Sequence, residues 1–187
     1  MRLFVAIEFD EPVKEALIAV QNRLGRFSRE VRWARPEQMH LTLKFLGEVP
    51  DEQVEAVCTA AGQVATQVGP FEIALAQCGC FPPRGAVRIV HCGTIDPTHS
   101  LQRCSELFEQ AFAELGFARE RRPFRAHLTV GRVREDRTQG RLRAAVDKIE
   151  CEPLTQSVDA LFVVQSQLDR GGARYANVAR HELAAGA

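Results

Sequence analysis

Apolar and polar residues alternate with a period of two over several short stretches of the chain, a pattern typical of β-strands with one buried face. The first stretch runs from Leu3 to Phe9. Asp10 then begins a helix with Pro12 in its first turn, which is expected to end near Gly25. The pattern predicts further strands and one more helix in this part of the chain: strands over 31–33, 40–46 and 71–80, and a helix over 51–68.

The same order of elements recurs in the second part of the chain. Strands are expected over 86–92, 127–130, 157–165 and 174–183, with helices over 96–115 and 138–148. The sequence therefore predicts an α+β fold built from a duplicated unit, with halves of roughly 1–84 and 85–187. Two mainly antiparallel sheets are expected to face each other with the helices outside. No linker rich in Gly, Ser or Pro separates the halves, so residues 1–187 are expected to form one domain.

Each half carries a His-Leu-Thr motif on a predicted strand, His40 with Thr42 and His127 with Thr129. In a strand, residues two apart share a face, so each motif presents an imidazole beside a hydroxyl. Five His and eight Thr in 187 residues would produce His-x-Thr by chance roughly 0.2 times, counted as a template match. Two matched copies at repeat spacing therefore indicate function, although a lone strand histidine is more often structural.

Two such motifs suit the chemistry of a phosphate ester. A histidine side chain ordinarily has a pKa near ~6.5, so one histidine can act as a base while the other is protonated as an acid. The threonine hydroxyls can donate hydrogen bonds to phosphate oxygens. A metal site is the competing interpretation, but neither motif has an adjacent carboxylate or second histidine. We therefore expect a metal-independent reaction that needs no cofactor.

The formal net charge is zero, which argues against a protein that coats nucleic acid non-specifically. Nine arginines and only three acidic residues nevertheless lie between Arg119 and Arg143, around the second motif. A solvated basic face is the ordinary explanation of such a run. Its position around His127 favours an anion site instead, with Arg122 and Arg125 of the preceding loop as candidate substrate-binding residues.

Two further residues are weaker candidates for substrate binding. Alternate residues of a strand share a face, which places Lys44 on the face of His40 and Thr42. There it is expected either to contact phosphate or to lie solvated at the rim of the cleft. Phe81, in a predicted loop, is expected either to stack on a base or to fill a turn in the core.

The redox state of the six cysteines depends on the compartment in which the protein is located. Neither an export signal nor a membrane-spanning stretch is apparent, so we expect a cytoplasmic protein, without membrane association, whose thiols are reduced. The cysteines are most simply interpreted as buried thiols, with a metal or redox role as the alternative.

The motifs His40-Leu41-Thr42-Leu43 and His127-Leu128-Thr129-Val130 resemble the paired signatures of the 2H phosphoesterase superfamily. The chain is most similar to its RNA 2′,3′-cyclic phosphodiesterases, also called 2′-5′ RNA ligase-like proteins. The resemblance covers nearly the whole chain. It extends to residues 2–7, 45–48, 122–124 and 174–175.

This resemblance implies a bilobal enzyme with both motifs facing a central cleft. It implies hydrolysis of a 2′,3′-cyclic phosphate at an RNA 3′ end to a 2′-phosphomonoester, and possible 2′-5′ ligation in reverse. In that scheme His40 is the proton donor, His127 the proton acceptor, and Arg132 binds substrate. Because successive side chains of a strand point to opposite faces, Arg132, five residues after His127, would point away from the cleft. A β-bulge is therefore expected near Gly131.

Two alternatives stay open at this point. The substrate could instead be a small cyclic nucleotide or a 2′-5′ oligonucleotide, or the chain could be a non-catalytic module that binds RNA ends. We expect a monomer, although the sequence contains no direct signal for the oligomeric state.

Overall fold

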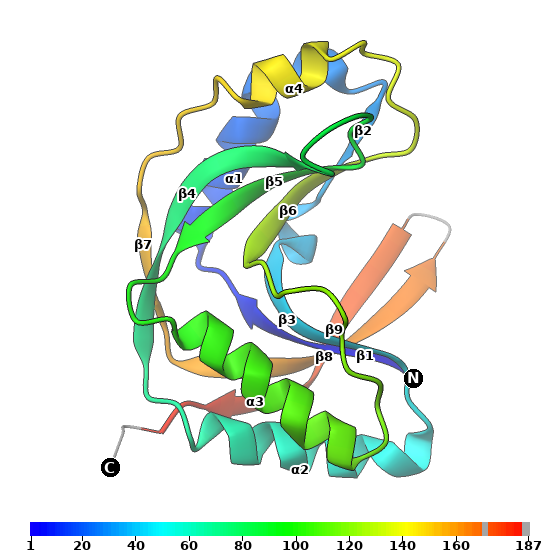
Figure 1. The fold of residues 1–187 in the computed structure, drawn as a ribbon, viewed down its shortest axis with the longest axis vertical. Helices are drawn as coiled ribbons and strands as arrows, with labels where there is room; N and C mark the ends of the chain where they lie inside the picture. The colour runs from blue at the N-terminus through cyan, green and yellow to red at the C-terminus, as the bar shows by residue number, and fades with distance from the viewer. Residues whose placement is uncertain (170–171, 185–187) are drawn as a thin grey trace.

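The computed structural model describes residues 1–169 and 172–184, in which nine strands form one curled antiparallel sheet (Figure 1). The strand order is β7-β4-β5-β6-β3-β1-β8-β9, and β2 pairs with β6. The strands are β1 (Arg2–Glu8), β2 (Val31–Trp33), β3 (His40–Glu48), β4 (Phe71–Phe81), β5 (Ile89–Ile95), β6 (His127–Val133), β7 (Thr155–Val158), β8 (Ala160–Asp169) and β9 (Gly172–Glu182). The helices are α1 (Glu11–Arg23), α2 (Val54–Ala65), α3 (Ser100–Glu114) and α4 (Arg141–Val146), with 3-10 turns at Gly25–Phe27, Pro36–Gln38 and Asp51–Gln53.

Most predicted elements are confirmed, with shifted ends. Asp10 is the N-cap residue of α1 and has a proline beside it in the first turn. The prediction of one strand over 157–165 was wrong, because the chain changes partners at Asp159. Before it β7 pairs with β4, and after it β8 pairs with β1. Phe81 is the last residue of β4 and not part of a loop.

The sheet consists of two lobes joined at one point. The first lobe contains β3, β1, β8 and β9, and the second lobe contains β6, β5, β4 and β7 with β2. Between the lobes, β3 and β6 pair only through Leu41 and Leu128 among the described residues. The predicted α+β fold with antiparallel strands is confirmed, and the two expected sheets are the two ends of this curled sheet.

Each half of the chain contributes to both lobes. Helix α1 packs against β6 of the second lobe, whereas α3 packs against β3 of the first. In the same way β4 pairs with β5, and β8 from the second half pairs with β1. The remaining helices cover the outer faces, α2 over β8 and β9, and α4 over β4 (Figure 1).

The core lies between the sheet and these helices. Alternate residues of β1, Leu3, Val5 and Ile7, are buried there, while Phe4 and Ala6 face the concave side with Val164. Leu41 and Leu128 are fully buried, so the outer face of each motif strand is anchored in the core. No helix in the described ranges is long and apolar enough to cross a membrane; the cytoplasmic location stays a prediction.

A β-bulge in β3 overturns the parity argument for Lys44. Val5 pairs with Lys44 and Ala6 pairs with Thr42, so Leu43 is the extra residue. Lys44 consequently points to the core side, where it is 5% exposed and its Nζ lies 2.7 Å from Glu109 Oε1. It also donates a hydrogen bond to the Ala118 carbonyl at 2.8 Å. Both expectations for Lys44, a phosphate contact and a solvated rim position, were wrong.

Lys44 therefore stabilises the fold, and its replacement separates stability from catalysis. We expect Lys44→Met to lower the free energy of unfolding by about 2–3 kcal/mol, because Glu109 loses its partner in a largely buried position. Chemical denaturation followed by circular dichroism measures this loss.

Catalytic efficiency per folded molecule should not change in this variant. Lys148→Met, at an exposed lysine, is the matched control and should alter neither quantity. A fall in kcat/KM for Lys44→Met at full folding would instead restore a role for this lysine in binding substrate.

Candidate active site

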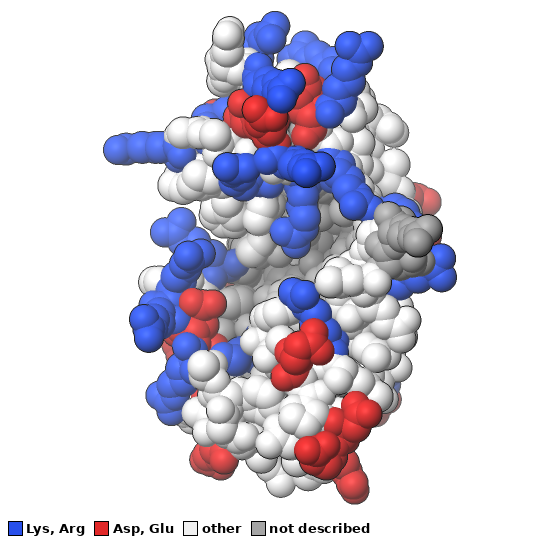
Figure 2. All heavy atoms as spheres, turned by 90° about the vertical axis from the view of Figure 1, so that its right-hand side faces the viewer, with Lys and Arg blue, Asp and Glu red and all other residues white. Residues whose placement is uncertain are grey.

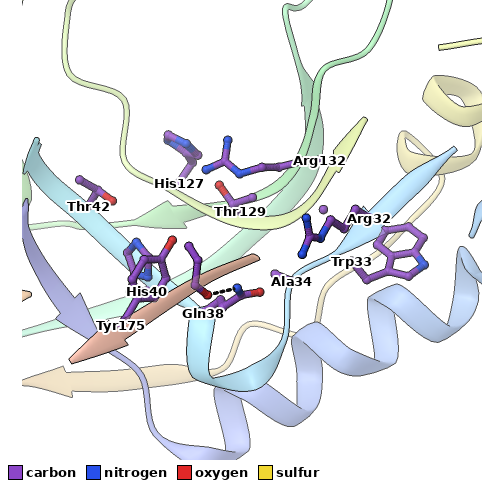
Figure 3. Close-up of a pocket in the computed structure, with 12 residues that line it drawn as sticks. Arg32, Trp33, Ala34, Gln38, His40, Thr42, His127, Thr129, Arg132 and Tyr175 are labelled. Carbon is purple, nitrogen blue, oxygen red and sulfur yellow. Dashed lines mark hydrogen bonds between the residues drawn. The ribbon is translucent and has the colours of Figure 1, made fainter. Parts of the chain in front are cut away.

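The two His-Leu-Thr motifs lie side by side where the lobes join. In the antiparallel register set by Leu41 and Leu128, the neighbouring positions bring His40 next to Thr129 and Thr42 next to His127. All four side chains project to the concave face, since the two leucines between them are buried behind the sheet. The strands thus present two imidazoles and two hydroxyls to one space (Figure 3).

A cavity of about 190 Å³ occupies this space. It is small beside the ~300–1,000 Å³ typical of sites for drug-sized ligands, so it suits a phosphate and its ring rather than a whole nucleotide. None of the described residues that line it carries a carboxylate. The lining residues are Arg32, Trp33, Ala34, Gln38, His40, Thr42, His127, Thr129, Gly131, Arg132, Ala173 and Tyr175.

The ring of His127 is held in one orientation by the chain just before it. Its Nδ1 lies 2.7 Å from the Arg125 carbonyl oxygen. A carbonyl can only accept, so Nδ1 carries the proton and the neutral ring keeps its lone pair on Nε2. The ring also makes edge contacts with Phe81 and His91, at centroid distances of 5.0 and 5.6 Å. His127 is therefore arranged to accept a proton through Nε2.

His40 lies in a more enclosed and aromatic environment. Its ring packs on Phe4 at a centroid distance of 4.7 Å and meets Tyr175 edge-on at 5.0 Å. Burial, followed by the positive charge of Arg132, lowers the pKa of His40 to about 4; a hydrogen bond with the Gln38 backbone opposes this shift. In the free protein this lowered pKa favours the neutral ring of His40 at pH 7.

Arg132 reaches the cavity because of a second β-bulge. In the pairing of β5 with β6, His91 faces Thr129 but Val90 faces Gly131, so Val130 is the extra residue. This bulge places Arg132 on the same face as Thr129 and confirms the expected irregularity beside Gly131. The guanidinium supplies fixed positive charge beside both histidines (Figure 3).

The other predicted substrate-binding residues lie outside the lining of this cavity. Phe81 stacks on His91 at 4.1 Å and contacts the ring of His127 edge-on, so it packs against the side of the second motif. Arg122 and Arg125 are exposed. The Arg125 carbonyl orients His127, and the Arg122 amide donates to Glu120 at 3.1 Å. Lys44, as described above, is turned to the core.

Several residues at the site were missed by sequence reasoning. Arg32, Trp33 and Gln38 line the cavity from the segment before the first motif. His91 lies against His127. Burial lowers the pKa of His91 to about 4, and the charge of His127 is the second cause. Only the cross-strand register with Thr129 would have revealed His91, and register is not readable from one strand alone.

Positive side chains border this face of the molecule. The space-filling view shows a hollow across the middle with Lys and Arg side chains gathered above it and along one side (Figure 2). Within the cavity itself the positive charges come from Arg32 and Arg132. The arrangement can therefore hold an anion between two hydroxyls and two arginines while one imidazole accepts a proton and the other donates one.

The comparison with protein families gives one match across most of the chain. The family described as LigT-like phosphoesterase matches residues 7–91 and 95–175. Both His-Leu-Thr motifs lie inside the matched ranges.

Curated relatives and solved structures agree with this match. An RNA 2′,3′-cyclic phosphodiesterase of Methanothermobacter thermautotrophicus is 28% identical over 181 residues, covering 95% of this chain and 96% of the relative. That of Archaeoglobus fulgidus is 36% identical over 134 residues, 72% of this chain and 73% of the relative. A crystal structure of a Thermus thermophilus protein superposes with a TM-score of 0.83 at 26% identity over 98% of both chains. Escherichia coli LigT complexed with 3′-AMP, 24% identical over 97% of both chains, has the same fold with a TM-score of 0.78.

Gly131 is the position where a side chain would disturb Arg132 most directly. A Cβ built there lies 2.5 Å from Val31 Cγ1 and 2.8 Å from Trp33 Cε3, so β2 must shift. We expect Gly131→Ala to reduce kcat/KM by about 10–100-fold, since small misplacements of a binding group are costly. Unfolding should become easier by about 1–3 kcal/mol through overpacking.

The rescue variant for this prediction is Gly131→Ala with Val31→Ala, which removes the closest contact and should recover part of the activity. Gly25→Ala is the control, because a Cβ at Gly25 meets nothing within 4 Å. Full activity of the single Gly131→Ala variant would show that the placement of Arg132 tolerates the shift.

The depressed pKa of His40 can be measured in the free protein. Titration by ¹⁵N-detected NMR of the imidazole should give a value near 4, far below the usual ~6.5. Arg132→Met should raise it, because the variant removes a positive charge that disfavours the imidazolium. Inorganic phosphate should raise it as well by adding negative charge.

Arg103→Met, on the exposed face of α3, is the charge-matched control and should leave the titration of His40 unchanged. An ordinary pKa for His40 in the free wild-type protein would refute the enclosed, cationic environment described for this ring.

Proposed function

Because the chain belongs to the LigT-like phosphoesterase family, we propose that it hydrolyses the 2′,3′-cyclic phosphate at RNA 3′ ends to a 2′-phosphomonoester. The observation that carries this proposal is the pair of His-Thr motifs, held on adjacent strands and facing one small cavity. The activity named for the curated relatives supports the substrate class. The reverse reaction would join a cyclic-phosphate end to a 5′-hydroxyl through a 2′-5′ bond.

In the proposed reaction His127 acts as the base and His40 as the acid. A water oxygen attacks phosphorus as its proton passes to Nε2 of His127, whose Nδ1 is engaged with the Arg125 carbonyl. The bond between phosphorus and the 3′ oxygen breaks, and His40 delivers a proton to that oxygen. Each proton transfer contributes roughly 10²–10⁴-fold to the rate.

Because the pKa of His40 is low in the free protein, the bound phosphate is proposed to favour protonation of this ring as well as to react. Without substrate, burial and Arg132 keep the ring neutral. The negative charge of a cyclic phosphate offsets Arg132 and favours the imidazolium. We infer that His40 becomes a competent acid only in the complex, which ties its protonation to binding.

Thr42 and Thr129 are assigned to the non-bridging oxygens, where hydrogen bonds to a charged acceptor contribute about 1.5–3 kcal/mol each. Arg132 stabilises the negative charge on the non-bridging oxygens in the transition state. The cavity lining offers imidazole, hydroxyl and guanidinium groups but, in its described part, no carboxylate to hold Mg²⁺ or Zn²⁺. This donor set favours a metal-independent reaction.

The size of the cavity favours the end of a longer chain as substrate. At about 190 Å³ it takes the cyclic phosphate and leaves the base and the preceding nucleotides on the basic surface outside. Small cyclic nucleotides and 2′-5′ oligonucleotides carry the same reactive group and remain the alternative substrates. We expect the protein to act as a monomer, since the described residues of one chain supply both motifs.

Replacing either histidine tests the assigned chemistry. His40→Ala and His127→Ala should each lower kcat by at least ~10² with modest change in KM, because acid–base roles act in the transition state. The substrate is an RNA oligonucleotide with a 2′,3′-cyclic phosphate, assayed in excess EDTA. Products separated by chromatography should contain a 2′-phosphate and no 3′-phosphate.

His99→Ala, at an exposed histidine, is the matched control and should keep wild-type rates. Near-normal turnover by either motif variant would overturn the acid–base roles. A 3′-phosphate product would reverse the assignment of the leaving oxygen. Binding without turnover in the wild-type protein would make the chain a module that recognises RNA ends.

A further inference from the structure

Three cysteines from distant parts of the sequence converge behind the second lobe. Cys78 on β4 and Cys92 on β5 are cross-strand partners, and their Sγ atoms are 2.7 Å apart. Cys151, in the segment between α4 and β7, lies 3.2 Å from Cys78 Sγ and 3.7 Å from Cys92 Sγ. The cluster is on the face of the sheet opposite to His91, so it is separate from the candidate active site.

Ordinary core packing accounts poorly for this triangle. Buried thiols are common in cores, but here three sulfurs are in mutual contact and two of them are almost fully buried, Cys78 at 5% and Cys92 at 0% exposure. A single disulfide would join only one pair and leave the third sulfur unexplained. A metal ion shared by all three accounts for their convergence, since their ligating atoms lie within 4.8 Å of one another. With sulfur–zinc bonds of ~2.3 Å in tetrahedral geometry, thiolates lie about 3.8 Å apart, so binding moves the sulfurs of Cys78 and Cys92 away from each other.

The chemistry of the cluster favours a soft cation. Thiolate sulfur selects Cu(I) and Zn(II) over hard cations such as Mg²⁺. Cys151 is the half-buried member of the cluster, so its sulfur is the one nearest to solvent.

We propose that Cys78, Cys92 and Cys151 form a structural site for a soft d¹⁰ cation, Zn(II) or Cu(I). Binding replaces the thiol protons by sulfur–metal bonds and releases those protons to solvent. The bound ion ties β4 and β5 to the segment after α4, which joins the sheet as β7 from Thr155 onward. It thereby stiffens the lobe that carries His127 without entering the reaction.

The test uses the full-length protein, reduced with a phosphine and freed of metal by a chelator. Zn²⁺ and Cu⁺ are added in separate experiments, with Cd²⁺ as the probe whose thiolate charge-transfer absorption reports sulfur ligation. We expect one equivalent of metal per chain and a rise in the melting temperature. Cys151→Ser, which spares the two most buried positions, should weaken binding more than ~100-fold, since losing a ligand exceeds the 10–100-fold cost of losing its support.

Cys58→Ser, at a half-buried cysteine outside the cluster, is the control and should bind like the wild type. Wild-type protein that binds no metal while reduced, or a Cys151→Ser variant that binds equally well, would refute the site. A disulfide found by mass spectrometry in protein that cannot bind metal would assign the cluster to redox chemistry and also overturn the proposal. Binding is measured without substrate, so a failure here is distinguishable from a failure of the proposed hydrolysis.

Discussion

One short strand contact determines the geometry of the candidate active site. β3 and β6 meet through Leu41 and Leu128, and this register sets each imidazole beside the hydroxyl of the other motif. The two leucines are fully buried, so the position of the four polar side chains is fixed by apolar packing on the reverse face. Few other sheet contacts join the lobes, and the space between them is left open for substrate. The same pairing thus supplies both the precision of the site and its accessibility.

The two β-bulges show how one inserted residue changes the chemistry of a strand. Both lie three residues after the histidine, at Leu43 and at Val130. In each case the residue five positions after the histidine returns to the concave face. That residue is Phe45 in the first motif and Arg132 in the second, so a symmetrical backbone carries an aromatic ring on one side and a cation on the other. Of these two matching positions, only Arg132 lines the cavity.

The sequence predicted the parts of the molecule that depend on local pattern. Strand and helix order, the shared face of His40 and Thr42, and the bulge beside Gly131 follow from periodicity, motif spacing and the resemblance to a known family. Sequence-based prediction failed where pairing between distant strands determines the position of a side chain. Lys44 was misplaced because a bulge has no signature in that stretch, and His91 was missed because its role depends on register across strands. The convergence of Cys78, Cys92 and Cys151 depends on segments up to 73 residues apart.

The crosswise contacts between the two halves of the chain bear on how such a molecule can arise. Helix α1 contacts β6 and α3 contacts β3, while β4 pairs with β5 and β8 pairs with β1. A polypeptide corresponding to one half would hold a helix and a terminal strand whose binding partners lie in the absent half. It could bury its apolar faces only by exchanging those elements with a second copy of itself, as domain-swapped dimers do. Fusion of such an exchanged pair would give crosswise contacts like those of the present chain, with one imidazole from each copy facing the same space.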